Sequence, residues 1–570
     1  MDIFAQVALV LGLAAGFGLI ARTLRQPPLI GYVVAGILIS GTLGRIEGGV
    51  LPEIMELMGK MGVTLLLFLT GLELPISELK KMGKAALVTG LGQIVITSIA
   101  GFGLARLLGF ETLTAVYIGI GLTFGSTIMV VKLLSEKGDL QSLSGRLATG
   151  YLLVQDFVAI GVLVVLSGLS AGNGIRPADL AGVLLKGGLM VAVAVSLSGK
   201  VMGKLVDHLA RSTELLFITS IGWCLAIAAL VASPWVGFSA EIGGLLAGLA
   251  LANVAEQAQI ISRVRPLRDF FLTWFFVYLG SNFQWSGVAG LLVPAGIFSL
   301  YVLTVNPLVV MAILGRMGYG RRTYFFTSLA VAQISEFSLI IMASAAALGQ
   351  IKSPVVSMMT IVALMTMTGS TYLILHARSL YEKFGKRIGW FELPGVHEKR
   401  AAGEKKPEGH AVLFGHNRVG SRIRPALEKT FPEVLVVDFN PEVVERLKTE
   451  GVNVVYGDMS DRDLYERLGI SAAAAVVSTV PDVNDNIHLL KELKQGGGKN
   501  GGKKPEQLVV LTANDQVDAR RLYELGADYV LVPHSLGGDF LNHVIAQHGV
   551  GEDMVEKVRN LGDYLVKKKS

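Results

Sequence analysis

The stretch YLLVQDFVAI, from Tyr151 to Ile160, places an amide and a carboxylate, Gln155 and Asp156, in the middle of an otherwise apolar run. An ionised carboxylate at the centre of a membrane helix costs a few kcal/mol or more, and acids found there usually have a function. The run therefore predicts a membrane helix that carries a functional acid.

The composition around this run is typical of a membrane protein. Of the 570 residues, 52% are hydrophobic, and the mean hydropathy is +0.55. These values exclude an ordinary soluble enzyme over the whole length. The apolar excess ends near Ser379, after which strand-like runs alternate with polar helices. We expect a transmembrane domain over 1–378, a linker over 379–409, a nucleotide-binding domain over 410–549 and a basic tail over 550–570.

Cysteine content and charge narrow the possible partners. The single cysteine, Cys224, excludes an intrachain disulfide and a thiolate metal cluster. The formal net charge of +6 is spread over loops, linker and tail. This distribution indicates a bias toward a membrane surface and not a nucleic-acid-binding stripe. The lipid bilayer is therefore an expected partner, and nucleic acid is not.

About thirteen apolar segments are long enough to cross a bilayer. They lie near 4–21, 29–43, 52–72, 85–105, 112–135, 147–168, 180–199, 215–232, 235–253, 267–284, 289–314, 324–347 and 354–376. The alternate loops that begin with Arg22 and Arg25 hold about 17 Lys and Arg residues, and the other loops hold about four. This asymmetry predicts a multi-pass protein of the cell inner (cytoplasmic) membrane, with the N-terminus outside and the C-terminal domain cytoplasmic.

The two halves of the membrane segment resemble each other. The stretch PPLIGYVVAGILISG resembles SPWVGFSAEIGGLLAGLALAN, and LLLFLTGLEL resembles LTWFFVYLGSNF. These alignments pair Gly31 with Gly237 and Gly71 with Gly280, about 206 and 209 residues apart. Each pair lies about seven predicted spans apart, and an odd number of spans inverts the second copy. Inverted repeats are typical of alternating-access transporters.

The same offset predicts two interrupted helices. It aligns GLTFGSTIMVV with AVAQISEFSLI, so that Ser126-Thr127 matches Ser335-Glu336. Both stretches interrupt an apolar span with small and polar residues, which is typical of helices broken near the membrane midplane, whose free ends face a cavity. The candidate ion- and proton-binding residues are therefore Asp156, Gln155, Ser126, Thr127 and Glu336.

Asp156 has the chemistry of a site shared by an ion and a proton. Burial beside an uncharged amide disfavours the ionised form, so protonation near neutral pH becomes accessible. A proton and a monovalent cation that need the same oxygens exclude each other, and mutual exclusion with alternating access is antiport. Because Gln155 does not titrate, the pair carries one negative charge, which suits a divalent ion poorly. The alternative is that Asp156 only caps a neighbouring broken helix.

Three other charged residues lie in apolar spans. Glu336 either binds an ion or forms a structural pair with an arginine such as Arg146. Glu241 and Lys60 are close enough to predicted span ends to snorkel to the surface, and we assign them no role.

The membrane segment resembles the monovalent cation:proton antiporter-2 family over about Met1 to Ala377. The resemblance is carried by PPLIGYVVAGILISG, LLLFLTGLEL, FGSTIMVVKLL, GRLATGYLLVQD, RPLRDFFLTWFFVYLG and AQISEFSLI. It implies that Asp156 is the residue that carries the ion and the proton. The Gln-Asp pair resembles that of Kef-type potassium efflux systems, whereas relatives with an Asp-Asp pair are associated with sodium/proton exchange, so the resemblance implies potassium as the ion. It also implies a dimerisation domain and a mobile core. Asn306-Pro307 stands where many relatives have a lysine, which by analogy favours electroneutral exchange.

The C-terminal half has the pattern of a Rossmann-like α/β domain. HAVLFGHNRVGSRIRPAL predicts a strand over 411–414 and a helix that opens near Gly420, and VLVVD, VNVVYGD, AAVVST, LVVLT and YVLVP predict further strands of a doubly wound parallel sheet. Asn417 replaces the middle glycine of the phosphate turn. Asp438 ends the second strand and can accept both ribose hydroxyls, which favours NAD(H) or AMP over NADP(H). Asp458 ends the third strand at the same edge.

This half resembles the RCK (TrkA-N or KTN) regulatory domains over about His410 to Gly549. The resemblance implies a homodimer and a regulatory nucleotide, NAD(H) or AMP, with no catalytic cofactor; it leaves an ancillary regulatory subunit open. Arg418 is either an anion contact or an exposed surface residue. The expected nucleotide-binding residues are Gly415, Asn417, Arg418, Gly420, Asp438 and Asp458.

These observations favour a polytopic α-helical membrane domain of about 13 transmembrane helices, with inverted repeats and two broken helices, followed by a cytosolic α/β Rossmann-like domain. The expected function is potassium efflux in exchange for protons, regulated by nucleotide binding, and not an enzymatic reaction. Three alternatives remain: a sodium/proton antiporter with the same regulation, a ligand-gated potassium channel, and a membrane-tethered dehydrogenase. Against a channel, the sequence contains no T-V-G-Y-G-like filter. Against a dehydrogenase, the nucleotide-binding fold has no second domain and no obvious His or Lys constellation for hydride transfer.

Overall fold

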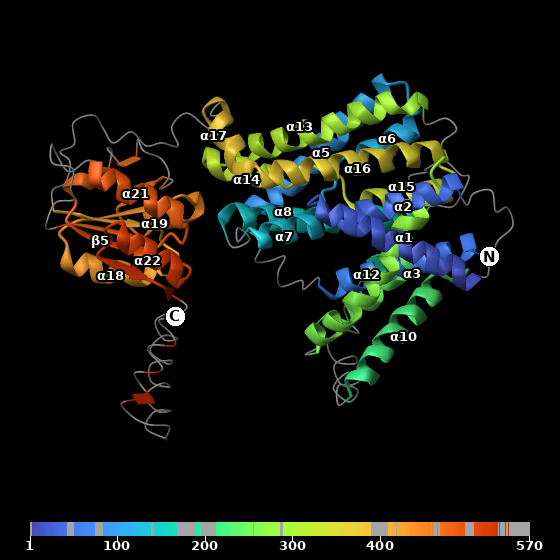
Figure 1. Ribbon diagram of the computed structural model, residues 1–570, viewed down its shortest axis with the longest axis horizontal. Helices are drawn as coiled ribbons and strands as arrows, with labels where there is room; N and C mark the ends of the chain where they lie inside the picture. Colours follow the sequence, from blue (N-terminus) through green and yellow to red (C-terminus); the bar gives the residue numbers. More distant parts are fainter. Residues whose placement is uncertain are drawn as a thin grey trace. The chain divides into compact units, whose positions relative to one another are not determined.

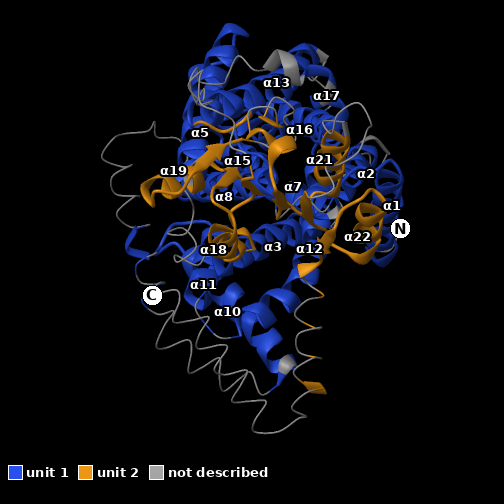
Figure 2. Ribbon diagram, turned by 90° about the vertical axis from the view of Figure 1, so that its left-hand side faces the viewer, with its two compact units in different colours: residues 1–317, 321–391 blue, residues 318–320, 392–570 orange. Residues whose placement is uncertain are grey.

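The computed structural model divides into two compact units, residues 1–317 with 321–391 and residues 318–320 with 392–570 (Figure 2). The structure describes residues 3–42, 51–73, 84–137, 142–167, 188–190, 212–252, 256–284, 289–388, 409–417, 419–457, 468–495 and 507–533, with a few single positions beside these ranges. The predicted linker begins within a helix, Ala377–Ile388, and its residues 389–408 and the basic tail lie outside the described residues.

The described residues of the first unit are helical (Figure 1). The helices are α1 (Ile3–Thr23), α2 (Pro28–Thr42), α3 (Leu51–Leu72), α5 (Lys84–Leu107), α6 (Thr112–Gly121), α7 (Thr127–Glu136), α8 (Leu143–Ser167), α10 (Thr213–Val231), α11 (Ala240–Leu251), α12 (Gln257–Ser281), α13 (Leu292–Arg316), α14 (Arg321–Leu329), α15 (Glu336–Ala347), α16 (Ser353–Leu375) and α17 (Ala377–Ile388), with a short 3-10 turn, η1 (Ala289–Leu291). Among the described residues, seven of these helices are long and apolar enough to cross a membrane.

The predicted spans overlap these helices, with one exception. Residues 180–199 lie largely outside the described part of the chain, so the count of about thirteen stays a prediction. The predicted breaks are present: residues 122–126 separate α6 from α7, and residues 330–335 separate α14 from α15. The predicted helical membrane fold is therefore confirmed.

Serine caps explain where each second half-helix begins. The Oγ of Ser126 accepts a hydrogen bond from the backbone N–H of Met129 at 3.4 Å, and the Oγ of Ser335 accepts one from Ser338 at 3.3 Å. Such caps satisfy backbone donors that the first turn of a helix leaves free. The two caps are 209 residues apart, so the alignment of Ser126 with Ser335 corresponds to equivalent structure.

Glycines form two equivalent helix seams. A Cβ at Gly71 of α3 would lie 2.4 Å from the carbonyl oxygen of Leu245 in α11, and a Cβ at Gly280 of α12 would lie 2.2 Å from that of Val33 in α2. Backbones this close leave no room for a side chain. The aligned glycines Gly71 and Gly280 therefore occupy matching positions in the two repeats.

The other aligned glycine pair is corrected by the structure. A Cβ at Gly36 would lie 2.2 Å from the carbonyl oxygen of Val277, and one at Gly248 would lie 2.0 Å from that of Phe68. Gly36 and Gly248 are thus the structural equivalents, in place of Gly31 and Gly237. Glycine-rich apolar stretches align in several registers, and only the contacts distinguish them.

The second unit contains a six-stranded parallel sheet with strand order β3-β2-β1-β4-β5-β6 (Figure 1). The strands are β1 (Ala411–Phe414), β2 (Val434–Asp438), β3 (Val454–Tyr456), β4 (Ala475–Ser478), β5 (Leu508–Thr512) and β6 (Tyr529–Leu531). The helices α18 (Gly420–Thr430) and α19 (Pro441–Thr449) pack on one face, and α21 (Val483–Gln495) and α22 (Gln516–Glu524) on the other; a short turn, η3 (Ile470–Ala472), precedes β4. The predicted doubly wound fold is confirmed.

Candidate functional site

Asp156 lies on α8 and is 8% exposed. Its Oδ2 accepts a hydrogen bond of 2.8 Å from the hydroxyl of Thr127, the first residue of α7. The partial positive charge of a helix N-terminus stabilises a nearby carboxylate. The structure therefore brings Asp156 and Thr127 together at the first break, as the sequence predicted they would lie.

Gln155 is fully buried beside the acid, but its amide is engaged with the protein. Its Oε1 accepts the backbone N–H of Gly125 at 2.9 Å, and its Nε2 donates to Oε1 of Gln93 at 2.5 Å. The glutamine thus connects α8 to the first break and to α5. This geometry gives Gln155 a bracing position next to the proposed ion site.

Two residues that sequence reasoning missed hold the first break in place. Gln93, on α5, donates to the hydroxyl of Thr97 at 3.0 Å and to the carbonyl oxygen of Thr123 at 3.1 Å. Asn306, on α13, donates to the carbonyl oxygen of Leu122 at 2.8 Å. These bonds satisfy backbone groups that the broken helix leaves free in an apolar setting. The only signal in the sequence is a lone amide in an apolar run.

The second break contributes further polar groups. Glu336, the first residue of α15, is 5% exposed, and Gln333 donates to the carbonyl oxygen of Ser126 at 3.4 Å. The backbone N–H of Ile334 donates to the hydroxyl of Thr366 at 3.3 Å, which matches the bond from Gly125 to its glutamine in the other repeat.

Three buried oxygens at the breaks have no hydrogen-bond partner in the described part of the chain. They are Oε1 of Gln333, Oε2 of Glu336 and Oδ1 of Asn306. A buried acceptor without a partner costs about 1–3 kcal/mol. Neutral and anionic oxygens of this kind are also the ligands that replace the water shell of an alkali cation.

The structure corrects the predicted partner of Glu336. Arg146 is exposed on α8, whereas the arginine that interacts electrostatically with Glu336 is Arg268 of α12. Arg268 is 9% exposed and also donates to Oδ1 of Asp269 at 2.7 Å. The helices α12 and α15 are remote in sequence, so no local pattern pairs these residues.

The glycine turn of the second unit has the geometry of a phosphate turn. Gly415 has a φ of +85°, and a Cβ at Gly420 would lie 1.9 Å from the carbonyl oxygen of Gly415. Only glycine fits these two positions without strain. Asn417 is exposed in the same turn, while Arg418 and Asp458 lie outside the described residues.

Asp438 clamps this turn to the end of β2. Its Oδ2 accepts the backbone N–H of His416 at 2.7 Å and its Oδ1 accepts that of Asn440 at 2.9 Å. His416 is 5% exposed. Burial lowers the pKa of its imidazole, and the nearby guanidinium groups of Arg424 and Arg446 lower the pKa further. Both Asp438 oxygens thus accept backbone N–H groups at the carboxyl edge of the sheet.

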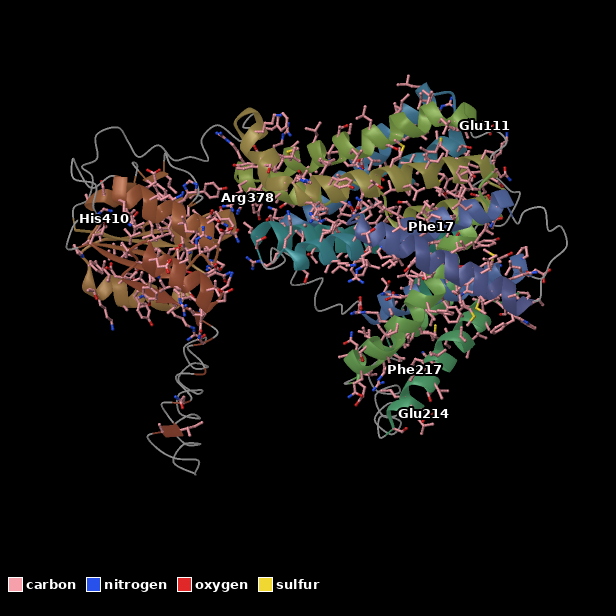
Figure 3. All side chains as sticks on the ribbon, in the orientation of Figure 1. Phe17, Glu111, Glu214, Phe217, Arg378 and His410 are labelled. Atoms are coloured by element: carbon pink, nitrogen blue, oxygen red, sulfur yellow. The ribbon has the colours of Figure 1, made fainter. Side chains whose placement is uncertain are left out.

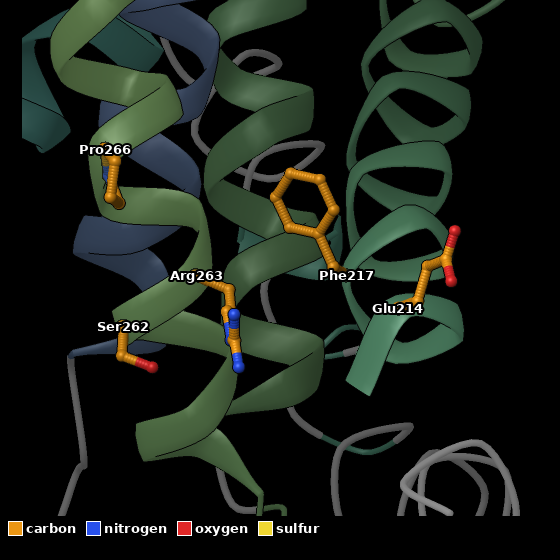
Figure 4. Close-up of a pocket in the computed structure, with 5 residues that line it drawn as sticks. All are labelled: Glu214, Phe217, Ser262, Arg263 and Pro266. Atoms are coloured by element: carbon orange, nitrogen blue, oxygen red, sulfur yellow. The ribbon is translucent and has the colours of Figure 1, made fainter. Parts of the chain in front are cut away.

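A separate cavity of about 440 Å³ lies between α10 and α12 (Figure 4). It is lined by Glu214, Phe217, Ser262, Arg263 and Pro266. None of these is a predicted site residue. The two acids at the breaks are buried, since Asp156 is 8% exposed and Glu336 is 5% exposed. Among the described residues, no group of three or more His, Cys, Asp or Glu side chains forms a metal cluster.

Comparisons with known proteins cover both units. The family described as "Sodium/hydrogen exchanger, transmembrane" matches residues 7–375, and the TrkA-N domain matches residues 411–533. The chain is 24% identical over 552 residues to "Putative cation/proton antiporter YbaL" of Escherichia coli (strain K12), covering 91% of this chain and 93% of that protein. It is 26% identical over 439 residues to "K(+) efflux antiporter 5" of Arabidopsis thaliana, covering 73% of each.

The helical unit has the fold of a solved antiporter structure. The sodium proton antiporter MjNhaP1 from Methanocaldococcus jannaschii, solved at pH 8, aligns with a TM-score of 0.53 at 18% sequence identity. The alignment covers 67% of this chain and 98% of that one. At this identity the likeness concerns the fold alone.

Proposed function

Because the chain belongs to the transmembrane sodium/hydrogen exchanger family, we propose that it exports potassium in exchange for protons under the control of a nucleotide. Family membership and the TrkA-N domain confirm the predicted resemblance, and the protein is a multi-pass cation/proton antiporter with a TrkA-N domain. The choice of ion, the nucleotide and the direction of control are the proposal.

The observation that carries the proposal is the bond between Asp156 and Thr127 at the first break. When Asp156 is ionised, a dehydrated cation can share its oxygens, and the Thr127 hydroxyl can rotate to offer a lone pair. When a proton binds the same oxygens, the cation loses its anionic ligand. The buried oxygens of Gln333, Glu336 and Asn306, which have no hydrogen-bond partner among the residues that the structure describes, can supply further neutral or anionic ligands.

Potassium is favoured over sodium by two features. The Gln155-Asp156 pair resembles that of Kef-type potassium efflux systems, and Gln155 bonds to Gly125 and Gln93. A relative that matches 73% of this chain is named "K(+) efflux antiporter 5". Sodium/proton exchange is the second candidate, since the family description and the matching solved structure both name sodium.

Control is assigned to the glycine turn of the second unit. Gly415 and Gly420 allow the tight turn into α18 at which a pyrophosphate or phosphate would bind, and Asp438 ends β2 beside it, where an acid suits the ribose of NAD(H) or AMP. A nucleotide that binds one transport state more tightly shifts the population toward that state. In the same proposal the protein is a homodimer in the inner membrane, with the N-terminus outside and the TrkA-N domain in the cytoplasm. An ancillary subunit is a further regulator of transport. It assigns transport and no chemical reaction to the protein.

Exchange in proteoliposomes tests the proposal. Purified protein is reconstituted with a trapped pH dye, and K+, Na+ or Rb+ is added over a series of pH values. We expect proton movement driven by K+ and Rb+, with a smaller response to Na+. A response to Na+ alone establishes the second candidate, and ion flux without proton movement contradicts antiport. Addition of NADH or AMP on the side of the TrkA-N domain is expected to change the rate.

A further inference from the structure

The cavity between α10 and α12 lies between two continuous helices. Its volume of about 440 Å³ is within the range of about 300–1,000 Å³ that is typical of ligand sites. Its lining comes from both helices, Glu214 and Phe217 from α10 and Ser262, Arg263 and Pro266 from α12 (Figure 4). The cavity can therefore hold the polar part of a ligand, and each helix contributes one charged side chain to it.

The hydropathy of the two helices places this cavity at a membrane surface. Glu214 is the first residue of an 18-residue apolar stretch that ends at Val231. On α12 the exposed Arg263 precedes an apolar run that begins at Phe270. Charged side chains at the ends of apolar spans lie at the level of the lipid headgroups. A phospholipid headgroup is therefore available at the depth of the cavity.

The arginine and the glutamate of the cavity are both unpaired. The next arginine along α12, Arg265, pairs with Glu73 at 3.0 Å. In the part of the chain that the structure describes, Arg263 and Glu214 form no salt bridge with each other or with any other residue. Two opposite charges thus line one cavity, and each is free to bind a group of the opposite sign.

A proline adds a backbone acceptor to the cavity wall. Pro266 lies inside α12 and has no backbone N–H, so the carbonyl oxygen of Ser262, four residues earlier, lacks its usual helical donor. The hydroxyl of Ser262 donates to the carbonyl oxygen of Gln259 at 2.8 Å, which leaves its lone pairs as acceptors. The wall therefore combines one cationic donor with acceptors from a carboxylate, a carbonyl and a hydroxyl.

The helix α10 has an apolar face beside the cavity. Leu215 and Ile218 are 54% and 57% exposed, and they share a face because they are three residues apart. Glu214 and Phe217 have the same spacing and occupy the neighbouring face. A molecule with a charged head in the cavity would thus find an apolar surface for a hydrocarbon chain directly beside it.

We propose that the cavity binds a phospholipid whose zwitterionic headgroup ends in a primary amine, phosphatidylethanolamine, from the cytoplasmic leaflet. The phosphate pairs with Arg263, and the ammonium donates to the carboxylate of Glu214 and to the free carbonyl oxygen of Ser262. The acyl chains lie on the apolar face of α10. The site is independent of which ion is exchanged, and the cytoplasmic side follows from the proposed orientation of the chain.

The charges of the cavity select this headgroup over two others. An anionic headgroup such as phosphatidylglycerol would pair with Arg263 but would also face the carboxylate of Glu214. Phosphatidylcholine is zwitterionic, but its quaternary ammonium has no N–H to donate to the carboxylate. Charge-assisted hydrogen bonds are about twice as strong as neutral ones, so the loss of one is measurable.

Native mass spectrometry of the full-length protein tests the site. Delipidated protein in detergent is mixed with equal amounts of phosphatidylethanolamine, phosphatidylcholine and phosphatidylglycerol that have identical acyl chains. We expect one phosphatidylethanolamine per chain to bind at least about fivefold more tightly than the other two lipids. The readout involves no transport, so it stays interpretable if the exchange proposal fails.

Two variants separate the contacts of the phosphate and the ammonium. Arg263→Gln should weaken the binding of phosphatidylethanolamine about fivefold or more, because it removes the partner of the phosphate. Glu214→Gln should reduce the preference over phosphatidylcholine to about twofold or less, because it removes the anionic acceptor of the ammonium. Arg316→Gln, at an exposed arginine in the last turn of α13, is the matched control and should bind like the native protein.

Lipid binding that ignores these charges would overturn the proposal. Equal binding of the three lipids, or native affinity in both Arg263→Gln and Glu214→Gln, would show that the cavity is not the site. Preferential binding of phosphatidylglycerol would exclude the zwitterionic headgroup.

Two further measurements identify other occupants of the cavity. Glycerophosphoethanolamine, which has the same headgroup and no acyl chains, should displace the lipid at least about a hundredfold less well, since each buried CH₂ contributes about 0.8 kcal/mol. Equal displacement would assign the cavity to a soluble ligand. In a Cys224→Ala background, a disulfide that joins two copies through Leu215→Cys would show that a second copy covers this face, which would also overturn the lipid site.

Discussion

The carboxylate of Asp156 is stabilised by a hydroxyl and by the N-terminus of α7, and neither carries a full positive charge. Burial still disfavours the ionised form, so the acid gains from binding either a proton or a monovalent cation. Glu336 differs, since Arg268 lies near enough to interact with it. The two acids therefore have different electrostatic surroundings, and Asp156 is the better candidate for alternate loading.

Substitution Asp156→Asn should abolish exchange at every pH. The amide keeps the size of the side chain and can still bond to Thr127, so stability is expected to change by no more than about 1–2 kcal/mol. Proton flux driven by K+ in proteoliposomes measures the effect. Glu111→Gln, at a side chain that is 78% exposed and labelled in Figure 3, is the matched control. Normal exchange in Asp156→Asn would remove the acid from the mechanism.

His416 should make the glycine turn sensitive to acid. The folded protein holds the pKa of this imidazole below its ordinary value of 6.5, so at lower pH the unfolded chain binds a proton that the folded chain does not. Stability of the turn is therefore complete above 6.5 and falls as the pH decreases from 6.5 toward the lowered pKa. Hydrogen exchange in the β1 turn, corrected for intrinsic rates, measures this in the full-length protein. His416→Gln should remove the pH dependence, and an unchanged profile would contradict the assignment.

The helix seams depend on glycine at a few positions. At Gly248 a Cβ would lie 2.0 Å from the carbonyl oxygen of Phe68, and at Gly103 of α5 the space within 4 Å is open. Gly248→Ala should therefore force α3 and α11 apart and cost about 1–3 kcal/mol. Gly103→Ala should be neutral or slightly stabilising, because alanine favours helix more than glycine does.

Thermal inactivation of the purified protein in detergent measures this pair of variants. The expected order of stability is Gly103→Ala at or above the native protein, with Gly248→Ala below both. Equal inactivation temperatures for the two alanine variants would show that the seam can relax at little cost.

Across the whole molecule, the two units should be separable in function. Asp438→Ala removes the acceptor of the His416 backbone N–H and the proposed ribose contact, so NADH and AMP affinity should fall about tenfold or more. The exchange site lies in the other unit and should retain its basal rate. Calorimetry and proteoliposome exchange measure the two properties on the same preparation. Unchanged affinity would exclude Asp438 from the nucleotide site, and loss of basal exchange would show that the turn supports transport directly.

Much of the architecture follows from local patterns. Apolar length predicts the spans, and small polar residues in the middle of two spans predict the breaks that separate α6 from α7 and α14 from α15. The strand pattern after the linker predicts β1 to β6 and their parallel direction, and the structure supplies the strand order. These features depend on neighbouring residues, because helix and strand periods and end caps are set within a few positions of the chain.

The composition of the site depends on contacts between remote segments. Asp156 and Thr127 were expected together because they lie on adjacent elements. The hydrogen bonds that hold the first break join remote residues: Gln155 and Gln93 are 62 positions apart, and Asn306 and Leu122 are 184 positions apart. Likewise, the arginine near Glu336 is Arg268 and not the predicted Arg146, and Arg268 is remote from Glu336 in the sequence. A single sequence shows which side chains can form hydrogen bonds. It does not show which remote helices lie close enough for those bonds to form, because helix packing decides that.

The chain's own pattern is thus sufficient for the membrane helices, their two interruptions, the acid at position 156 and the glycine turn of a parallel sheet, since periodicity, capping and backbone freedom are local properties. Folding in three dimensions places Gln155 between Gly125 and Gln93, leaves buried oxygens at the breaks without hydrogen-bond partners among the described residues, and brings Arg268 near Glu336. Those outcomes arise from the close approach of glycine-lined helices, whose register no local pattern contains.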